Sequence, residues 1–317
     1  MDFFGALLGI SGFLAAAVLI VSYICFRMAF YTSCTSDDVL ELPQGEIYAP
    51  YRDFMESCAR ELRSMPCEEL WTTAFDGVKL YGRYFEYAPG APIELMFHGY
   101  RGSAERDLSG GVRRSFALGH SVILVDQRGC GKSDCNVITF GINEHRDCLS
   151  WLAKIQERFG NDTKIILTGI SMGASTVLMA AGKPLPKNVI GVIADCGFTS
   201  AKEIIQVVIR QMGLPRTILY PFVRLGARLY GHFDLEETSA LEALKSCNIP
   251  VIFFHGEDDA FVPCEMSRIN YAACTSRKML VTVPKAGHGL SYPTQPERYL
   301  NALQDFFDEA NIQPPLL

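Results

Sequence analysis

Short apolar runs alternate with longer stretches of mixed polarity along most of this chain. Runs rich in Val, Ile, Leu and Phe predict buried strands, and the stretches between them have the spacing of amphipathic helices. The predicted strands cover residues 68–73, 79–87, 93–97, 121–125, 165–168, 189–194, 251–254 and 279–283. The first two flank the turn residues Phe75-Asp76-Gly77 and alternate in polarity, which predicts an antiparallel, half-exposed pair. The later alternation of strands and helices predicts parallel β-α-β units.

Helical patterns fill most of the remaining chain. They predict helices over residues 51–64 and 141–159, another from residue 174, and a last one that starts at residues 294–297. The sequence Thr294-Gln295-Pro296-Glu297 predicts a capped amino-terminus for that last helix. Between residues 198 and 249 the strand–helix rhythm stops. Two helical segments there, 200–212 and 216–230, predict a helical insertion over about residues 199–248.

The amino-terminal residues 3–26 form an uncharged apolar run of 24 residues. At 1.5 Å per residue, a helix of this length spans the hydrocarbon core of a bilayer. A cleaved signal peptide is the alternative, but the run lacks a basic segment before it and exceeds the usual apolar length. We therefore predict a single-pass transmembrane anchor, followed by a linker and lead-in helix over residues 27–67. Arg27 follows the run and no basic residue precedes it, which predicts a cytoplasmic position for the rest of the chain.

Composition narrows the possible partners. The 317 residues carry a net charge of −6 and contain no basic run, which argues against a nucleic-acid partner. The eleven cysteines are odd in number and have neither disulfide-like nor metal-ligand spacing. We expect reduced thiols, as in a cytoplasmic domain, and no metal or organic cofactor.

The strongest chemical signal lies between the predicted strand at 165–168 and the following helix. Gly169-Ile170-Ser171-Met172-Gly173 is a G-x-S-x-G motif in a strand–turn–helix context. A serine on such a sharp turn projects above the sheet, and its flanking glycines permit the strained backbone. The helix amino-terminus behind it offers N–H groups to an anion. This arrangement predicts that Ser171 is a nucleophile.

A nucleophilic serine needs a base and an acid that orients the base. His288 is flanked by glycines directly after the strand at 279–283. Three acidic residues, Glu257, Asp258 and Asp259, follow the strand at 251–254, and their position after that strand leaves all three open. In each case the chain order is serine, acid, histidine.

These residues resemble the motifs of α/β-hydrolases of the serine-hydrolase type, in the esterase, lipase and prolyl-oligopeptidase-like group. The resemblance covers residues 68–311, as one domain. Besides Gly169-Ile170-Ser171-Met172-Gly173, the matching segments are His98-Gly99-Tyr100-Arg101-Gly102, residues 126–131, the pattern His255-Gly256 to Asp259 and Val262-Pro263, and Gly287-His288-Gly289.

The resemblance implies an α/β-hydrolase fold with a mostly parallel central sheet flanked by helices, and a small helical lid at about residues 199–248. It implies Ser171 as nucleophile, His288 as base and, from its spacing after His255-Gly256, Asp259 as the acid. The backbone N–H groups of Met172 and Tyr100 would form the oxyanion hole. The glycine-rich loop at 126–133 lacks the spacing of a phosphate-binding loop. We therefore expect structural roles for Asp126, Arg128 and His98.

We accordingly expect a serine hydrolase that cleaves a carboxylic ester or thioester through an acyl-enzyme. An apolar lid and a membrane anchor favour a lipophilic, lipid-like acyl substrate. Two alternatives stay open at this stage. One is a peptidase or aminopeptidase of the same fold, and the other is a catalytically silent, membrane-anchored binding scaffold.

Overall fold

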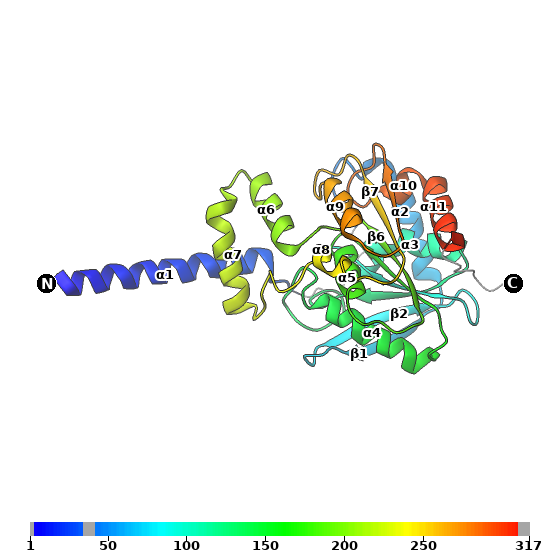
Figure 1. Ribbon diagram of the computed structural model, residues 1–317, viewed down its shortest axis with the longest axis horizontal. Helices are drawn as coiled ribbons and strands as arrows, with labels where there is room; N and C mark the ends of the chain where they lie inside the picture. Colours follow the sequence, from blue (N-terminus) through cyan, green and yellow to red (C-terminus); the bar gives the residue numbers. More distant parts are fainter. Residues whose placement is uncertain (1–2, 34–41, 310–317) are drawn as a thin grey trace.

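An eight-stranded sheet forms the centre of the protein (Figure 1). The computed structural model describes residues 3–33 and 42–309. The strands are β1 (Glu68–Thr73), β2 (Lys79–Phe85), β3 (Ile93–Phe97), β4 (Ser121–Asp126), β5 (Ile165–Ile170), β6 (Val189–Asp195), β7 (Val251–Gly256) and β8 (Lys278–Val283). Their spatial order is β1-β2-β4-β3-β5-β6-β7-β8. β2 is antiparallel to β1 and β4, and the neighbours from β4 to β8 pair in parallel, which confirms the predicted mostly parallel sheet.

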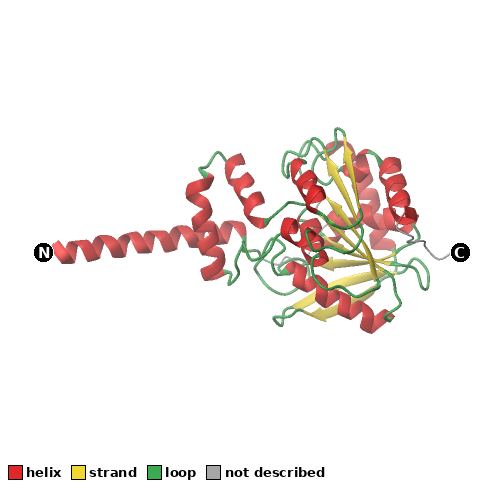
Figure 2. Cartoon of the chain, viewed as in Figure 1, coloured by secondary structure: helices red, strands yellow, loops and turns green. Residues whose placement is uncertain are grey.

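Helices cover both faces of the sheet, as Figure 2 shows in red against yellow strands. On one face lie α3 (Ala104–Ala117), with α2 (Arg52–Ser64) packed on it, and α11 (Pro296–Glu309). On the other lie α4 (Glu144–Phe159), α5 (Met172–Ala181), α8 (Ala240–Leu244) and α9 (Glu265–Ala273). The apolar residues of β5 show why both faces need cover. Ile166 packs into the cluster under α11, whereas Ile165 and Leu167 pack into the larger cluster that includes α5.

Three local predictions differ from the structure. β2 is mostly buried rather than half-exposed, because it lies between β1 and β4 instead of at the edge of the sheet. The helix predicted from residue 141 begins at Glu144, since the Glu144 carboxylate accepts hydrogen bonds from the N–H groups of Thr139 and Gly141 and closes a turn before it. The predicted cap at Thr294 is also wrong. Thr294 ends a separate short helix, α10 (Ser291–Thr294), and its hydroxyl donates to the Tyr51 hydroxyl.

The amino-terminal helix α1 (Phe3–Ala29) projects from the domain (Figure 1). Its span Gly9–Ala29 has a mean hydropathy of 2.2, and only 11% of the most apolar 18-residue part of this span is buried against the rest of the protein. By length and composition the span is a candidate for a membrane anchor or a signal sequence. The helix continues three residues past the predicted end of the anchor, and Phe26 and Phe30 are buried in the core. Residues 34–41 of the predicted linker, and 310–311 of the predicted domain, lie outside the described residues.

The insertion contains α6 (Ala201–Gln211) and α7 (Arg216–Tyr230), and α7 crosses α1 (Figure 1). The crossing is close: a Cβ on Gly226 would lie 2.4 Å from the Ser22 carbonyl oxygen. The Tyr230 hydroxyl donates to the Leu19 carbonyl, and its ring packs edge-on against Tyr23. The insertion is therefore packed against α1 as well as against the α/β domain.

Candidate active site

Ser171 lies at the sharp turn between β5 and α5, where the chain reverses above the sheet. Its backbone is in a strained, positive-φ conformation (φ 56°, ψ −117°). The flanking glycines are there because no side chain fits. A Cβ on Gly173 would lie 2.0 Å from the Phe97 carbonyl oxygen, and one on Gly169 would lie 2.2 Å from the Gly173 carbonyl oxygen. The motif is thus a steric requirement of packing β3, β5 and α5 together.

The three side chains predicted as a triad lie in one hydrogen-bonded line. Nε2 of His288 lies 2.9 Å from Oγ of Ser171, and Nδ1 of His288 lies 2.7 Å from Oδ2 of Asp259. The other predicted acids, Glu257 and Asp258, are exposed, while the Asp259 side chain is fully buried. Of the three acids, the structure brings Asp259 to the histidine.

Asp259 is held as a carboxylate by its surroundings. Its Oδ1 accepts hydrogen bonds from the N–H groups of Phe261 (2.9 Å) and Val262 (2.8 Å). Burial alone would raise the pKa of the Asp259 carboxyl, but hydrogen bonds from His255 and His288 hold this pKa well below its usual range. His255 is a supporting residue: its Nε2 lies 3.2 Å from Oδ2 of Asp259, and its Nδ1 lies 2.6 Å from Oγ of Ser267.

The predicted oxyanion donors flank Ser171. Met172 is the first residue of α5, so its N–H has no partner one turn earlier in the helix. Tyr100 lies in the loop of residues 98–102, called the oxyanion loop below, which follows β3. Gly99 brings that loop against the serine, since a Cβ there would lie 3.5 Å from Cβ of Ser171. Asp107 of α3 lines the cleft and holds the loop, since its Oδ2 accepts the Gly99 N–H at 3.0 Å.

Comparison with known proteins agrees with this architecture. The family model of the alpha/beta hydrolase fold matches residues 95–234, which contain the oxyanion loop and the serine turn. The Pyrococcus furiosus esterase Pf2001 superimposes with a TM-score of 0.65 at 20% identity, over 88% of this chain and 98% of that one. The chain has an α/β-hydrolase fold.

Its relatives by sequence are distant. Bacillus subtilis YqkD is 28% identical over 61% of this chain, which spans just under two thirds (64%) of that relative. Schizosaccharomyces pombe protein bem46 is 25% identical over 71% of this chain and 70% of its own. The Acinetobacter calcoaceticus bifunctional esterase/perhydrolase DCH is 25% identical over 73% of this chain and 96% of its own. These similarities support a hydrolase of esterase-like type.

A cleft of about 330 Å³ opens at Ser171 and His288. Its apolar lining comes largely from outside the predicted lid and includes Pro43, Tyr48, Met55, Tyr100, Ile170 and Phe261. Of the described residues that line the cleft, none belongs to 199–248. The insertion contacts the loop that carries Asp259, because the Gln211 side chain donates a hydrogen bond to the Ala260 carbonyl at 2.7 Å.

The segment of residues 42–55, predicted as linker and lead-in helix, instead covers the cleft. The Tyr48 hydroxyl donates to the His288 carbonyl at 3.3 Å, and burial raises the pKa of Tyr48 to about 12. Sequence reasoning missed this segment as part of the site. Its aromatic and apolar residues were the available signal, but they read equally well as helix packing.

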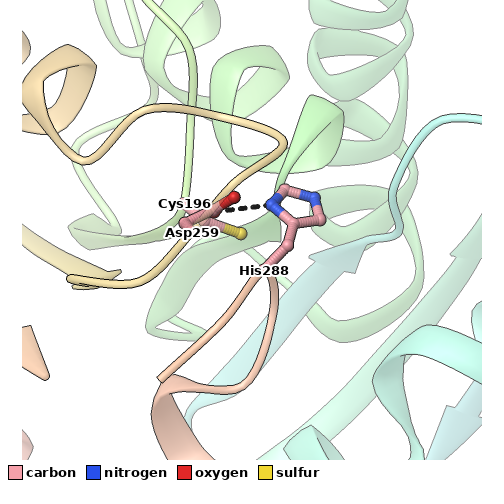
Figure 3. Close-up of side chains that lie close together, drawn as sticks. All are labelled: Cys196, Asp259 and His288. Carbon is pink, nitrogen blue, oxygen red and sulfur yellow. Dashed lines mark hydrogen bonds and ion pairs between the residues drawn. The ribbon is translucent and has the colours of Figure 1, made fainter. Parts of the chain in front are cut away.

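Cys196 lies beside the candidate triad, as Figure 3 shows with Asp259 and His288. One ligand-capable atom of each of these three residues lies within 4.8 Å of the others. Cys196 is fully buried, and burial raises the pKa of its thiol well above the usual value. A neutral, enclosed thiol is a poor metal ligand. The geometry therefore favours Asp259 as partner of His288 over a shared metal site.

The three motif residues expected to be structural have structural contacts. The Asp126 carboxylate accepts the Lys132 N–H at 3.0 Å within its own loop. The Arg128 guanidinium pairs with Asp147 of α4 (2.6 Å) and with Asp76 of the β1–β2 turn (2.9 Å), so it binds carboxylates of this protein rather than a phosphate. His98 is fully buried, and its Nε2 accepts the Gln127 N–H at 3.0 Å.

Proposed function

We propose that this α/β-hydrolase is a serine hydrolase that cleaves a lipophilic carboxylic ester or thioester. The observation that carries the proposal is the hydrogen-bonded line Ser171–His288–Asp259 at the mouth of the cleft. In the proposed reaction, Nε2 of His288 takes the Ser171 hydroxyl proton as Oγ attacks the substrate carbonyl carbon. The N–H groups of Tyr100 and Met172 stabilise the oxyanion that forms.

The acyl-enzyme forms when the tetrahedral intermediate collapses. His288 then donates its proton to the leaving alkoxide or thiolate, and the Ser171 Oγ–acyl bond remains. In the second half, water attacks the acyl carbonyl carbon while His288 takes a proton from that water. The Oγ–acyl bond then breaks, His288 returns the proton to Ser171 Oγ, and the acid product leaves. Asp259 keeps the histidine in the tautomer with its proton on Nδ1 and stabilises the imidazolium.

The substrate class is proposed from the lining of the cleft. Tyr48, Met55, Ile170 and Phe261 offer apolar contact, which suits an acyl or alkyl chain. The test is a series of p-nitrophenyl esters of increasing chain length, beside aminoacyl arylamides, with Ser171→Ala as the inactive reference. Phe26 and Phe30 are buried in the domain, so removal of the amino-terminal helix would take away part of the core. The assay therefore uses the full-length chain in detergent micelles. Arylamide hydrolysis faster than ester hydrolysis would favour a peptidase and contradict the proposal.

We also propose that α1 anchors the domain to a membrane, on the cytoplasmic side. Two observations support the anchor: the apolar length of α1, and exposed apolar residues on the insertion that packs against α1. Met212, Leu214 and Ile218 at the α6–α7 turn are exposed, and a lipid surface beside α1 would cover them.

Anchoring and orientation are tested separately. Full-length protein should stay in the pellet after carbonate washing, and its recovery in the supernatant would contradict an anchor. For orientation, Cys67 is exposed on the domain and should react with a membrane-impermeant maleimide only after the cells are permeabilised. The Cys67→Ser variant identifies the signal, and labelling of Cys67 in intact cells would reverse the proposed topology.

A further inference from the structure

We propose that the carboxyl-terminal end of α1 is a positioning element of the active site, and that Arg101 and Tyr100 couple it to the oxyanion loop. This inference rests on the proposed function, because it concerns how one oxyanion donor is held. It assigns to the proposed anchor helix a part in catalysis in addition to membrane attachment.

Both central residues of the oxyanion loop bind the end of α1. The Tyr100 hydroxyl donates to the Ala29 carbonyl at 2.8 Å. The Arg101 guanidinium donates to the carbonyl of Met28 (2.9 Å), in the last turn of α1, and to that of Tyr31 (3.0 Å), just past its end. The last carbonyls of a helix have no partner within the helix and carry the negative end of its dipole. Arg101 therefore supplies both hydrogen bonds and the favourable charge at this end of α1.

The backbone of the loop links these side chains to the predicted donor. The Gly102 N–H bonds to the Gly99 carbonyl at 3.1 Å and closes a tight turn around Tyr100 and Arg101. Arg101 is in the left-handed conformation (φ 51°), which is unfavourable for a residue other than glycine. Surrounding contacts must maintain such a conformation. The Arg101 guanidinium lies 5.0 Å from the centroid of the Tyr100 ring, and it donates its hydrogen bonds to Met28 and Tyr31. The turn that carries the Tyr100 N–H therefore depends on the end of α1 and the residues just after it.

The end of α1 is itself fixed in the domain. Phe30 is fully buried and packs edge-on against Phe140 and Phe233, with ring centroids 5.8 Å and 5.2 Å apart. Phe140 in turn packs against the Tyr100 ring at 4.9 Å. Since Asp107 of α3 binds the Gly99 N–H, the oxyanion loop is held at Gly99 by α3 and at Tyr100 and Arg101 by the end of α1.

This geometry predicts a particular kinetic effect. Removal of an oxyanion donor lowers kcat by about 10²- to 10³-fold in related chemistry, so a misplaced donor should lose part of that. We expect Arg101→Ala to lower kcat about tenfold while KM changes about twofold or less, because the donor acts on the transition state. Tyr100→Phe, which removes only the hydroxyl and keeps the backbone N–H, should lower kcat about threefold. Arg101→Lys should recover part of the loss.

The experiment uses the full-length chain in detergent micelles and a soluble p-nitrophenyl ester. Arg210→Ala is the matched control, because Arg210 is an exposed arginine on α6 away from the cleft. The decisive readout is inhibition by a trifluoromethyl ketone, which forms a tetrahedral oxyanion on the serine. Its Ki should rise in Arg101→Ala by the same factor by which kcat/KM falls.

Three outcomes separate the possibilities. A lower melting temperature with unchanged kcat and Ki in Arg101→Ala would overturn the inference, because it would mean a structural role only. If Arg101→Ala does not fold, Tyr100→Phe decides, and wild-type kcat and Ki in that variant overturn the inference. If Ser171→Ala keeps full esterase activity, the proposed function itself fails, whatever the Arg101 variant does.

Discussion

Replacement of Asp259 by Asn should nearly abolish hydrolysis while it leaves the fold intact. The Asn side chain has almost the same shape, but it has one accepting oxygen instead of two. Oδ1 of Asp259 accepts two backbone N–H groups, from Phe261 and Val262. The amide oxygen must keep these two bonds, because the amide NH₂ group cannot accept them.

The amide NH₂ then faces Nδ1 of His288, which lies 2.7 Å from Oδ2 in the parent. It can only donate there, so the histidine proton moves to Nε2, the atom that faces Ser171. In that tautomer His288 cannot accept the serine proton. The same change in a serine protease triad costs about 10⁴ in kcat, which corresponds to about 5 kcal/mol in the activation free energy.

The assay compares kcat/KM of Asp259→Asn with that of Asp258→Asn on the same p-nitrophenyl ester. Asp258 is exposed, and its variant should stay within about twofold of the parent, as is usual for surface changes. Circular dichroism and melting temperature establish that both variants fold. A larger loss at Asp258, or an Asp259→Asn variant with more than about a tenth of parental activity, would refute the tautomer argument.

Three further predictions concern the surroundings of the site. Gly99→Ala would place a methyl group 3.2 Å from Oδ2 of Asp107, the atom that accepts the Gly99 N–H, and 3.5 Å from Cβ of Ser171. The oxyanion loop must shift to relieve the tighter contact, so we expect kcat/KM to fall about 10²-fold with a small change in melting temperature. A variant with parental activity would contradict the proposed role of this loop. Burial alone would raise the pKa of Glu94, but the Arg114 charge and a hydrogen bond from His120 lower it to about 2. Its carboxylate therefore stabilises the fold above its usual pKa near 4.5, and this contribution is lost as the pH falls toward 2. Glu94→Gln should lower the free energy of unfolding by about 3 kcal/mol at pH 7 in urea titrations, and a difference that persists near pH 2 would contradict the assignment. In the native protein iodoacetamide should modify the exposed Cys67 and spare the buried Cys196, and modification of Cys196 without unfolding would contradict its burial.

The sheet and the catalytic candidates could be predicted because their signals are local. The apolar run at Ile165 identifies a strand without knowledge of its neighbours. The glycines around Ser171 are required by contacts that recur wherever this strand, turn and helix pack together. Asp259 and His288 each follow a strand, and parallel strands bring such loops to the same edge of the sheet.

The contacts of α1 could not be predicted in this way. Tyr100 and Ala29 are 71 residues apart, and the acceptor is a backbone carbonyl, which every residue has. The residue type at position 29 therefore does not indicate this hydrogen bond. An apolar helix predicts membrane insertion by its composition, and nothing in that composition separates Phe26 and Phe30, which are buried, from the exposed residues before them. For the same reason the helices of 199–248 resembled a lid over the cleft. The structure places α7 against α1, because Gly226 permits a close crossing that hydrophobic periodicity does not report.

The central claim is that Ser171 is an activated nucleophile. The most direct measurement is reaction of the full-length protein in micelles with a fluorophosphonate probe, followed by peptide mapping of the adduct by mass spectrometry. We predict one adduct, on Ser171, that is absent in Ser171→Ala and forms far more slowly in His288→Ala. An adduct on another residue, or equal labelling of the parent and the His288→Ala variant, would contradict the claim.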